Sequence, residues 1–309
     1  MLSAVLLASM IIGMFMGVHA GLPSLPLTDA QINLYFFIRL PRILGSAVIG
    51  AGLATAGAAY QSAFKNPIVS PGVLGVSAGA GVGAAVAIIL GINSITAFAC
   101  IGALVTVWCV WNIAKIISTS TAYIIVVGTI ISGIAGSVLS IIKFLADPTS
   151  ALPAIMFWLM GSLSSLRVIN YWQYAIILVC CIVFYMMRWR LDILYQPSKM
   201  VRSLGIDEKK NIGFIVFIST IISAIACSIS GVINMVGLAV PHFVRLWKGS
   251  DSNEKCLLDI QLAGAIFLVW IDNLIRSMPI EMPIGIFTSL IGGLIFGICT
   301  LIRKRRMNK

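Results

Sequence analysis

The sequence predicts an all-α polytopic membrane protein with about ten transmembrane helices, one of them short, plus short coupling and interfacial helices. Of its 309 residues, 60% are hydrophobic and only 10% are charged, and the mean hydropathy is +1.05. A soluble domain carries about 25% charged residues, so that class is excluded. Apolar runs recur along the chain, and we treat residues 1–309 as one transmembrane domain.

The apolar runs lie near residues 2–19, 43–64, 73–90, 95–117, 121–145, 171–187, 212–229, 236–247, 257–276 and 284–302. The run at 236–247 is short for a full crossing and contains Pro241. Residues 153–163 are too few to span, so we expect a re-entrant or surface helix there. Residues 1–20 resemble a signal peptide, but no Lys or Arg precedes the apolar core, so we expect a retained first span.

The net charge of +11 could indicate a nucleic-acid partner, but its distribution favours a membrane topology. Ten spans place both termini on one side, and 16 of the basic residues then fall on that side against 5 on the other. Because basic loops stay in the cytoplasm, we expect both termini to be cytoplasmic. We expect contact with membrane lipid and no nucleic-acid partner.

Small residues recur at every fourth position in four of the runs, and residues four apart share one helix face. The four series are Ser46, Gly50, Ala54 and Ala58; Gly75, Gly79, Gly83 and Ala87; Gly128, Ser132, Gly136 and Ser140; and Gly285, Ser289, Gly293 and Gly297. Such faces let helix backbones approach closely, and their serines can also face a pore. We therefore expect helix packing at Gly50, Gly79, Gly83, Gly136 and Gly293.

The sequence offers no catalytic or metal site. It has no Gly-x-x-x-x-Gly-Lys-Ser/Thr loop for ATP phosphates, and its seven cysteines show no metal-ligand spacing. Its two histidines, His19 and His242, are far apart, and a buried structural histidine is the simpler interpretation of His242. No nucleophile, base and ligand cluster indicates an enzyme.

An ion-coupled secondary transporter is the rival hypothesis, because such proteins need buried carboxylates. Asp272 is the one acid clearly inside a predicted span, and Arg276 follows four residues later. A local pair on one helix face is the simpler explanation of these two residues. Uptake that survives ATP depletion but requires a proton gradient would favour the rival.

A polar break, Lys65–Gly72, separates the second and third runs, and its two prolines and a glycine stop the helix. The segments that flank and contain it read Arg39-Leu-Pro-Arg42 and Asn66-Pro-Ile-Val-Ser-Pro-Gly-Val-Leu-Gly-Val-Ser-Ala-Gly-Ala-Gly81. Together with Gly237-Leu-Ala-Val-Pro-His-Phe-Val-Arg245, this wording resembles the FecCD-type permease subunits of ATP-binding-cassette (ABC) importers, which take up ferric siderophores, haem and cobalamin.

The resemblance implies an importer in the cytoplasmic (inner) membrane of a prokaryote. The partners would be a second copy of the chain, two ATPase subunits and an extracytoplasmic substrate-binding protein, with ATP and Mg bound by the ATPase and no cofactor bound by this chain. Iron(III)-siderophore or haem-type chelates are the cargo we expect, with cobalamin as the alternative. A heterodimer with a paralogous permease stays open.

The resemblance also implies two sets of site residues. A translocation gate would comprise Ser118, Thr119 and Ser120 opposite Asn66, Pro67 and Ile68. Binding-protein docking would use Arg39, Arg42 and Arg276, which the expected topology places outside. Basic residues are disfavoured on the extracytoplasmic side of a membrane protein, so three arginines there indicate a specific role. Arginine can grip a partner's carboxylate bidentately, while snorkelling to lipid headgroups is the alternative.

Residues 191–210 form the longest polar interval of the chain. Pro197 can begin a helix over residues 198–204, and Gly205 can end it. Met200, Val201 and Leu204 would give this helix an apolar face. The resemblance implies that this segment, including Arg202, docks on the ATPase and couples it to the permease, whereas a solvated basic loop is the alternative.

Overall fold

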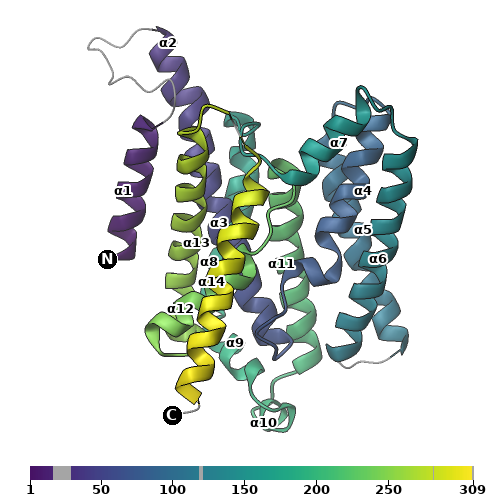
Figure 1. The fold of residues 1–309 in the computed structure, drawn as a ribbon. Coiled ribbons are helices and arrows are strands. Elements are labelled where there is room, and N and C mark those ends of the chain that lie inside the picture. The colour runs from purple at the N-terminus through teal and green to yellow at the C-terminus, as the bar shows by residue number, and fades with distance from the viewer. Residues whose placement is uncertain (17–28, 118–120, 281, 308–309) are drawn as a thin grey trace.

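The computed structural model describes residues 1–16, 29–117, 121–280 and 282–307, and within these ranges the regular elements are all helices (Figure 1). The ten predicted apolar runs each correspond to one helix, so the predicted fold class is confirmed. These helices are α1 (Leu2–Phe15), α3 (Leu40–Ala63), α4 (Val76–Ile89), α5 (Ile95–Ile117), α6 (Thr121–Leu145), α8 (Tyr171–Met186), α11 (Glu208–Ser230), α12 (Val236–Lys248), α13 (Asn253–Arg276) and α14 (Ile284–Met307). Seven helical stretches of the described residues are long and apolar enough to cross a membrane.

Shorter helices connect or extend these elements. They are α2 (Asp29–Ile32), the π-helix η1 (Asn33–Arg39), the 3₁₀-helices η2 (Pro71–Leu74) and η3 (Val168–Asn170), α7 (Ala151–Met160), α9 (Arg188–Tyr195) and α10 (Ser198–Ser203). The prediction for residues 43–64 was too short, because η1 continues into α3 as one helical stretch over Asn33–Ala63. A short helix was predicted over 153–163, and the structure has α7 there with its bounds shifted to Ala151–Met160. Helix α7 lies at the top of Figure 1.

Helix α3 lies at the centre of the fold. Its glycines allow the backbones of α12 and α13 to pack closely against it. A Cβ atom on Gly50 would overlap the carbonyl oxygen of Gly264 in α13, and one on Gly57 would overlap that of Gly237 in α12. In the second layer, Gly79 and Gly83 of α4 lie equally close to the backbone of α5. At Gly50, Gly79 and Gly83 the neighbouring helix is thus too close for any side chain, which is typical of helix packing through small residues.

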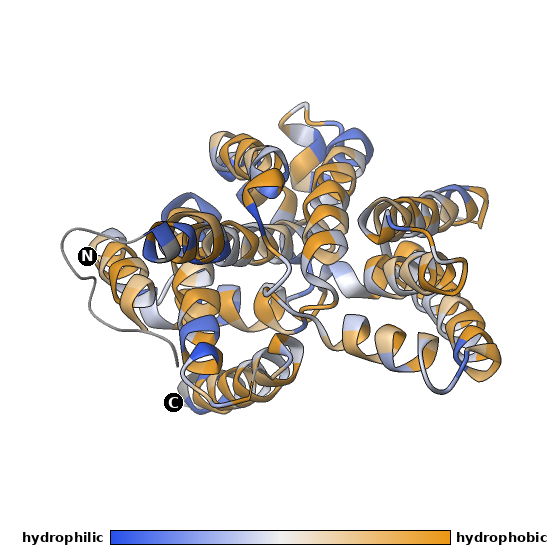
Figure 2. Cartoon of the chain, turned by 90° about the horizontal axis from the view of Figure 1, so that it is seen from above, coloured by the Kyte–Doolittle hydropathy of each residue, from blue (hydrophilic) through white to orange (hydrophobic). Residues whose placement is uncertain are grey.

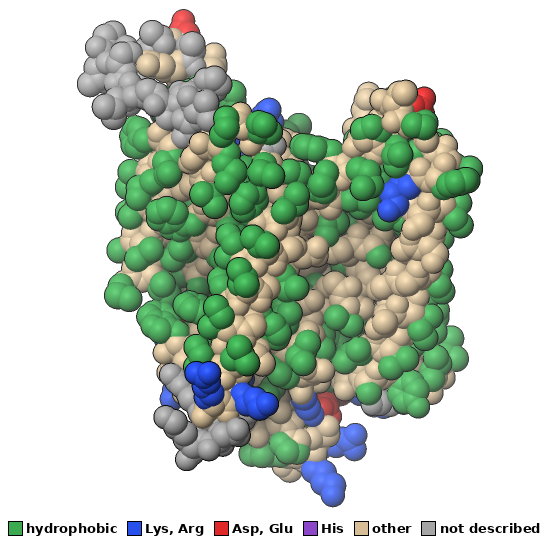
Figure 3. All heavy atoms as spheres, in the orientation of Figure 1, with side chains coloured by type: hydrophobic (Ala, Val, Ile, Leu, Met, Phe, Trp, Pro, Cys, Tyr) green, Lys and Arg blue, Asp and Glu red, His purple; other side chains and the backbone are tan. Residues whose placement is uncertain are grey.

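Many large apolar side chains lie exposed on the outside of the bundle. Figure 2 shows hydrophobic residues on the outward sides of the peripheral helices, and Figure 3 shows them as a broad apolar belt. Lys and Arg gather below this belt, at the end that holds α9, α10 and the C-terminal turn of α14, which we call the basic end. An apolar belt with a basic end is typical of a protein oriented in a membrane.

Candidate functional site

The turn that follows α3 occupies the basic end and is built as the sequence predicts. Lys65 stops the helix in the left-handed region with φ of +51°. The Asn66 side-chain oxygen then accepts a hydrogen bond from the backbone N–H of Ile68 at 3.0 Å, a local turn that asparagine favours. Ile68 leaves 64% of its side chain exposed. An apolar side chain projected from a polar turn is available for contact with another chain.

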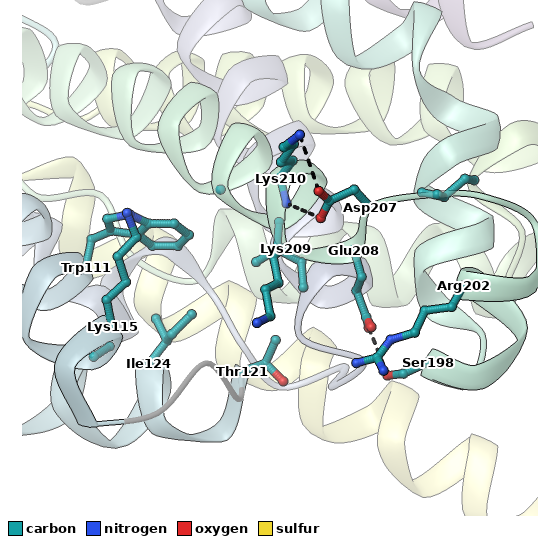
Figure 4. Close-up of a pocket in the computed structure, with 14 residues that line it drawn as sticks. Trp111, Lys115, Thr121, Ile124, Ser198, Arg202, Asp207, Glu208, Lys209 and Lys210 are labelled. Carbon is teal, nitrogen blue, oxygen red and sulfur yellow. Dashed lines mark hydrogen bonds and ion pairs between the residues drawn. The ribbon is translucent and has the colours of Figure 1, made fainter.

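Residues 118–120, the other half of the predicted gate, lie outside the described residues. Their flanks, however, are described: Lys115 near the end of α5 and Thr121 at the start of α6 line a cavity of about 840 Å³. Figure 4 shows these two residues on one side of the cavity and Ser198 and Arg202 of α10 on the other. The structure thus brings the flanks of the predicted gate next to the predicted coupling helix.

Helix α10 carries apolar side chains on two sides, one turned into the bundle and one exposed. Val201 is fully buried against the bundle, while Met200 and Leu204 expose 52% and 55% of their side chains at the basic end. Pro197 caps the helix, and Gly205 closes it in the left-handed region with φ of +72°. The helix is therefore anchored by one apolar side chain and presents two others, with Arg202 exposed beside them.

Lys65 ties the turn after α3 to the coupling segment. Its Nζ donates to Ser198 Oγ of α10 at 3.0 Å and lies 2.6 Å from Glu208 Oε1 of α11. Asp207 caps α11 by accepting from the backbone N–H of Lys210, and this bond holds the pKa of Asp207 below its usual range, aided by the charge of Lys210. The start of α11, α10 and the turn after α3 are thus joined by polar contacts.

The predicted docking arginines are not presented freely at the surface. Arg42 lies 2.8 Å from one carboxylate oxygen of Asp272, and Arg276 lies 3.1 Å from the other. Arg39 is buried, donates to the carbonyl of Met14 at 2.6 Å and packs over a tyrosine ring. The expected local pair of Asp272 and Arg276 is confirmed, but Arg42 joins it across two helices. Docking by these arginines stays a prediction, and it requires competition with Asp272.

One polar cluster was missed by the sequence analysis. Asp192, Asn253, Arg245, Gln61 and Ser62 come together at the basic end, although they lie on four different helices. The one available signal was Gln61, an amide inside an otherwise apolar run, since a buried amide demands partners.

Neighbouring His242 is buried as expected and packs its ring 5.2 Å from that of Phe296. Its Nε2 has no hydrogen-bond partner among the described residues. Nor does any group of three or more His, Cys, Asp or Glu side chains within those residues form a possible metal site. All seven cysteines are free thiols, and five are buried, in agreement with their interpretation as small apolar side chains.

A bundle of apolar helices with a basic end, where a polar turn lies beside the amphipathic helix α10, is the structure of a polytopic membrane protein. The profile of the FecCD transport family matches residues 1–303. The chain therefore belongs to the FecCD transport family and is the permease subunit of a prokaryotic ABC importer, whose ATP hydrolysis is carried out by separate subunits.

Known proteins similar to this chain extend over most of its length. It is 32% identical to the molybdate import system permease protein MolB of Haemophilus influenzae, over 91% of this chain and 85% of that protein. It is 33% identical to a probable iron chelatin transport system permease protein of Helicobacter pylori, over 84% of this chain and 79% of that protein. A solved inward-facing structure of a metal-chelate-type ABC transporter superposes with a TM-score of 0.90, at 31% identity and 97% coverage of both chains.

Proposed function

We propose that the permease moves an iron(III)-siderophore or haem-type chelate, with cobalamin as the alternative cargo. The observation that carries this proposal is the outer face of α6. Its exposed residues between 121 and 142 are apolar or carry hydroxyls, and none of them is charged. Such a face suits a bulky organic chelate, which offers apolar surface and hydrogen-bonding groups, better than a small oxyanion that needs positive charge.

Uptake into proteoliposomes tests the cargo. The permease is reconstituted with its ATPase and binding protein, and ferric siderophore, haem, cobalamin and molybdate are supplied separately. We expect ATP-dependent accumulation of an iron chelate or haem. Accumulation of molybdate alone would overturn the cargo assignment, and accumulation driven by a proton gradient without ATP would favour a secondary transporter.

A second copy of the chain is proposed to cover α6 and α14. Gly136 and Gly293 belong to the predicted packing faces, yet a Cβ atom on either would meet nothing within 4 Å in this chain. The hydroxyls of Ser137 and Ser140 beside Gly136 are exposed and bond only to their own helix. Faces of small residues serve close helix contact in membranes, so these two faces await a partner helix.

The translocation gate is proposed to lie where the two copies meet at the basic end, with Thr119 and its neighbours opposite Asn66, Pro67 and Ile68. Cysteine at 119 or in place of Ile68 should cross-link the two copies in the closed state, and the cross-link should weaken when nucleotide opens the gate. Cysteine in place of Ile101, an exposed residue of α5, is the control. Absence of state-dependent cross-linking at both sites contradicts the gate.

The ATPase is proposed to dock on Met200 and Leu204 of α10, and to carry the ATP and Mg of the complex. Replacing Leu204 and Gly205, or giving both Met200 and Leu204 a carboxylate, should reduce ATPase co-purification and abolish transport. The reason is that buried interface charges are costly when unpaired. Ile280→Asp adds a charge at an exposed apolar residue outside α10 and should leave co-purification unchanged. Normal assembly and transport by the α10 variants would refute this interface.

The topology follows from the same proposal. The ATPase works in the cytoplasm, so the basic end and both termini face that compartment, and Arg39, Arg42 and Arg276 lie toward the binding protein. The excess of Lys and Arg at the basic end supports this orientation (Figure 3). The test places a single cysteine at either terminus and adds a membrane-impermeant thiol reagent. We expect labelling in inside-out vesicles and none in right-side-out vesicles.

A further inference from the structure

A polar network at the basic end, half-buried at Asp192 and buried further in, joins four helices that are distant in sequence. It begins at Asp192 in α9, the first short helix of the coupling segment. The Asp192 carboxylate accepts from the backbone N–H of Asn253 at 2.5 Å, from that of Glu254 at 3.1 Å and from Ser252 Oγ at 2.6 Å. These groups form the first turn of α13, whose N–H donors have no partner within the helix.

Asp192 thus caps α13 from outside. Ser252 occupies the N-cap position of α13, where serine usually accepts a hydrogen bond from the first turn, but it makes no such bond. It donates to Asp192 instead, and a carboxylate at a helix N-terminus is favoured by the helix dipole. Any movement of α9 therefore acts directly on the beginning of α13.

The network continues from Asn253 to the last turn of α3. The Asn253 side chain donates to Asp192 at 2.8 Å and to Ser62 Oγ at 2.9 Å, and its oxygen accepts from Arg245 of α12 at 3.0 Å. Arg245 Nη1 in turn donates to Gln61 Oε1 at 2.6 Å. Gln61, Ser62, Asn253 and Arg245 are all buried, so these bonds are shielded from water and charge-assisted at the arginine.

Gln61 and Ser62 immediately precede the turn that carries Asn66, Pro67 and Ile68. The same turn is tied to α10 through Lys65 and Ser198. Both short helices of the coupling segment therefore hold the end of α3, α9 through the buried network and α10 through Lys65. A change in the position of either helix changes the support of the turn.

We propose that Asp192, Asn253, Arg245 and Gln61 form a relay that transmits movement of the ATPase-docking segment to the inner turn after α3. The relay rests on the proposed docking of the ATPase at this segment and adds four positioning residues to it. A closely packed chain of buried hydrogen bonds has few alternative arrangements, so displacement at one end is passed on rather than absorbed.

The test separates transmission from stability by removing both partners of one bond. In the double variant Gln61→Leu/Arg245→Met, both partners of the 2.6 Å bond become apolar, which preserves stability better than removing one of them. Asn253 Oδ1 and the carbonyl of Gly237 each lose one donor, and the assembly measurement reports that cost. The measurements are ATPase co-purification, ATP hydrolysis and the amount of chelate transported per ATP. We expect normal assembly and hydrolysis, with transport per ATP reduced about five- to tenfold, the lower part of the usual range of coupling between sites.

Two further variants complete the experiment. Asp192→Asn keeps the shape of the side chain, loses the charge that caps α13 and should also lower transport per ATP. Thr55→Val is the control, because Thr55 is as buried on the same helix but lies outside the relay: it donates to the carbonyl of Ala51 and accepts from Cys181 Sγ of α8 at 3.8 Å. It should leave transport per ATP unchanged.

The outcomes distinguish the relay from the docking proposal. If the wild-type complex couples hydrolysis to transport and both the double variant and Asp192→Asn do so equally well, the relay is refuted while docking stands. If substitutions in α10 leave ATPase binding intact, the docking proposal itself fails. Loss of coupling in Thr55→Val to the same extent would show a general effect of α3 packing and would also refute the relay.

Discussion

Gly57→Ala is expected to prevent accumulation of the folded permease. A single methyl group at this position would overlap the backbone of Gly237, including its carbonyl oxygen, where α3 crosses α12. No flexible side chain can move aside, so the two helices would have to separate along a fully buried contact. Overpacking of a buried site costs about 1–3 kcal/mol and more when the backbone must shift, and here we expect the upper part of that range or beyond.

The measurement is the yield of monodisperse protein after detergent extraction and its thermal unfolding temperature. Gly72→Ala is the matched control, because it adds the same methyl group at a helical position where the nearest atom, Ser70 Oγ, is 3.8 Å away. This control should leave the stability of the single chain unchanged or raise it slightly through helix propensity. Equal yield and equal unfolding temperature for the two variants would show that α3 and α12 are not in backbone contact.

The long helices could be read from the sequence because length and hydropathy decide them. The predicted runs 95–117 and 121–145 coincide with α5 and α6. The ends of α3 and α4 followed from the prolines and glycines of the break between them. The sequence analysis did not predict the short helices that are rich in polar or aromatic residues. These are η1 (Asn33–Arg39) and α9 (Arg188–Tyr195), which lack a long apolar run, so hydropathy did not indicate them. Gly75 lies on the predicted packing face, close to Thr106 and Ser132, and it also adopts φ of +81° at the N-cap of α4, which the spacing did not indicate.

For the candidate sites as well, features set by local sequence could be predicted, and contacts between distant residues could not. Local pattern identified α10, its apolar face and the turn after α3. Partners across the fold were invisible, since Arg42 and Asp272 are 230 residues apart and Asp192 and Asn253 are 61 apart. The contact between α3 and α13 cannot be read from the sequence, so no carboxylate could be assigned to Arg42, and a role at the surface was the natural hypothesis.

Asp272→Asn is expected to weaken the fold and strengthen docking of the binding protein at the same time. Asp272 is 1% exposed and lies against Arg42 and Arg276, whose side chains are 11% and 9% exposed, so its neutralisation removes the charge that it offers to both arginines. Breaking a buried ion pair from one side costs about 3–5 kcal/mol, which a lower unfolding temperature will report. The same change removes the internal competitor for both arginines, so carboxylates of a docking partner should bind them more tightly.

Arg42→Glu should be at least as destabilising, because it places a second carboxylate beside buried Asp272. A loss of docking in this variant would therefore reflect the weakened fold as well as the interface. The matched control is the triple variant Arg42→Met/Asp272→Leu/Arg276→Met, in which apolar side chains replace the whole buried ion network and stability should largely return. If the arginines dock the binding protein, this stable variant loses affinity while Asp272→Asn gains it, and added salt weakens native docking. If both variants bind the partner as the wild type does, the three charges serve only to join α3 to α13, and docking lies elsewhere on the extracytoplasmic face.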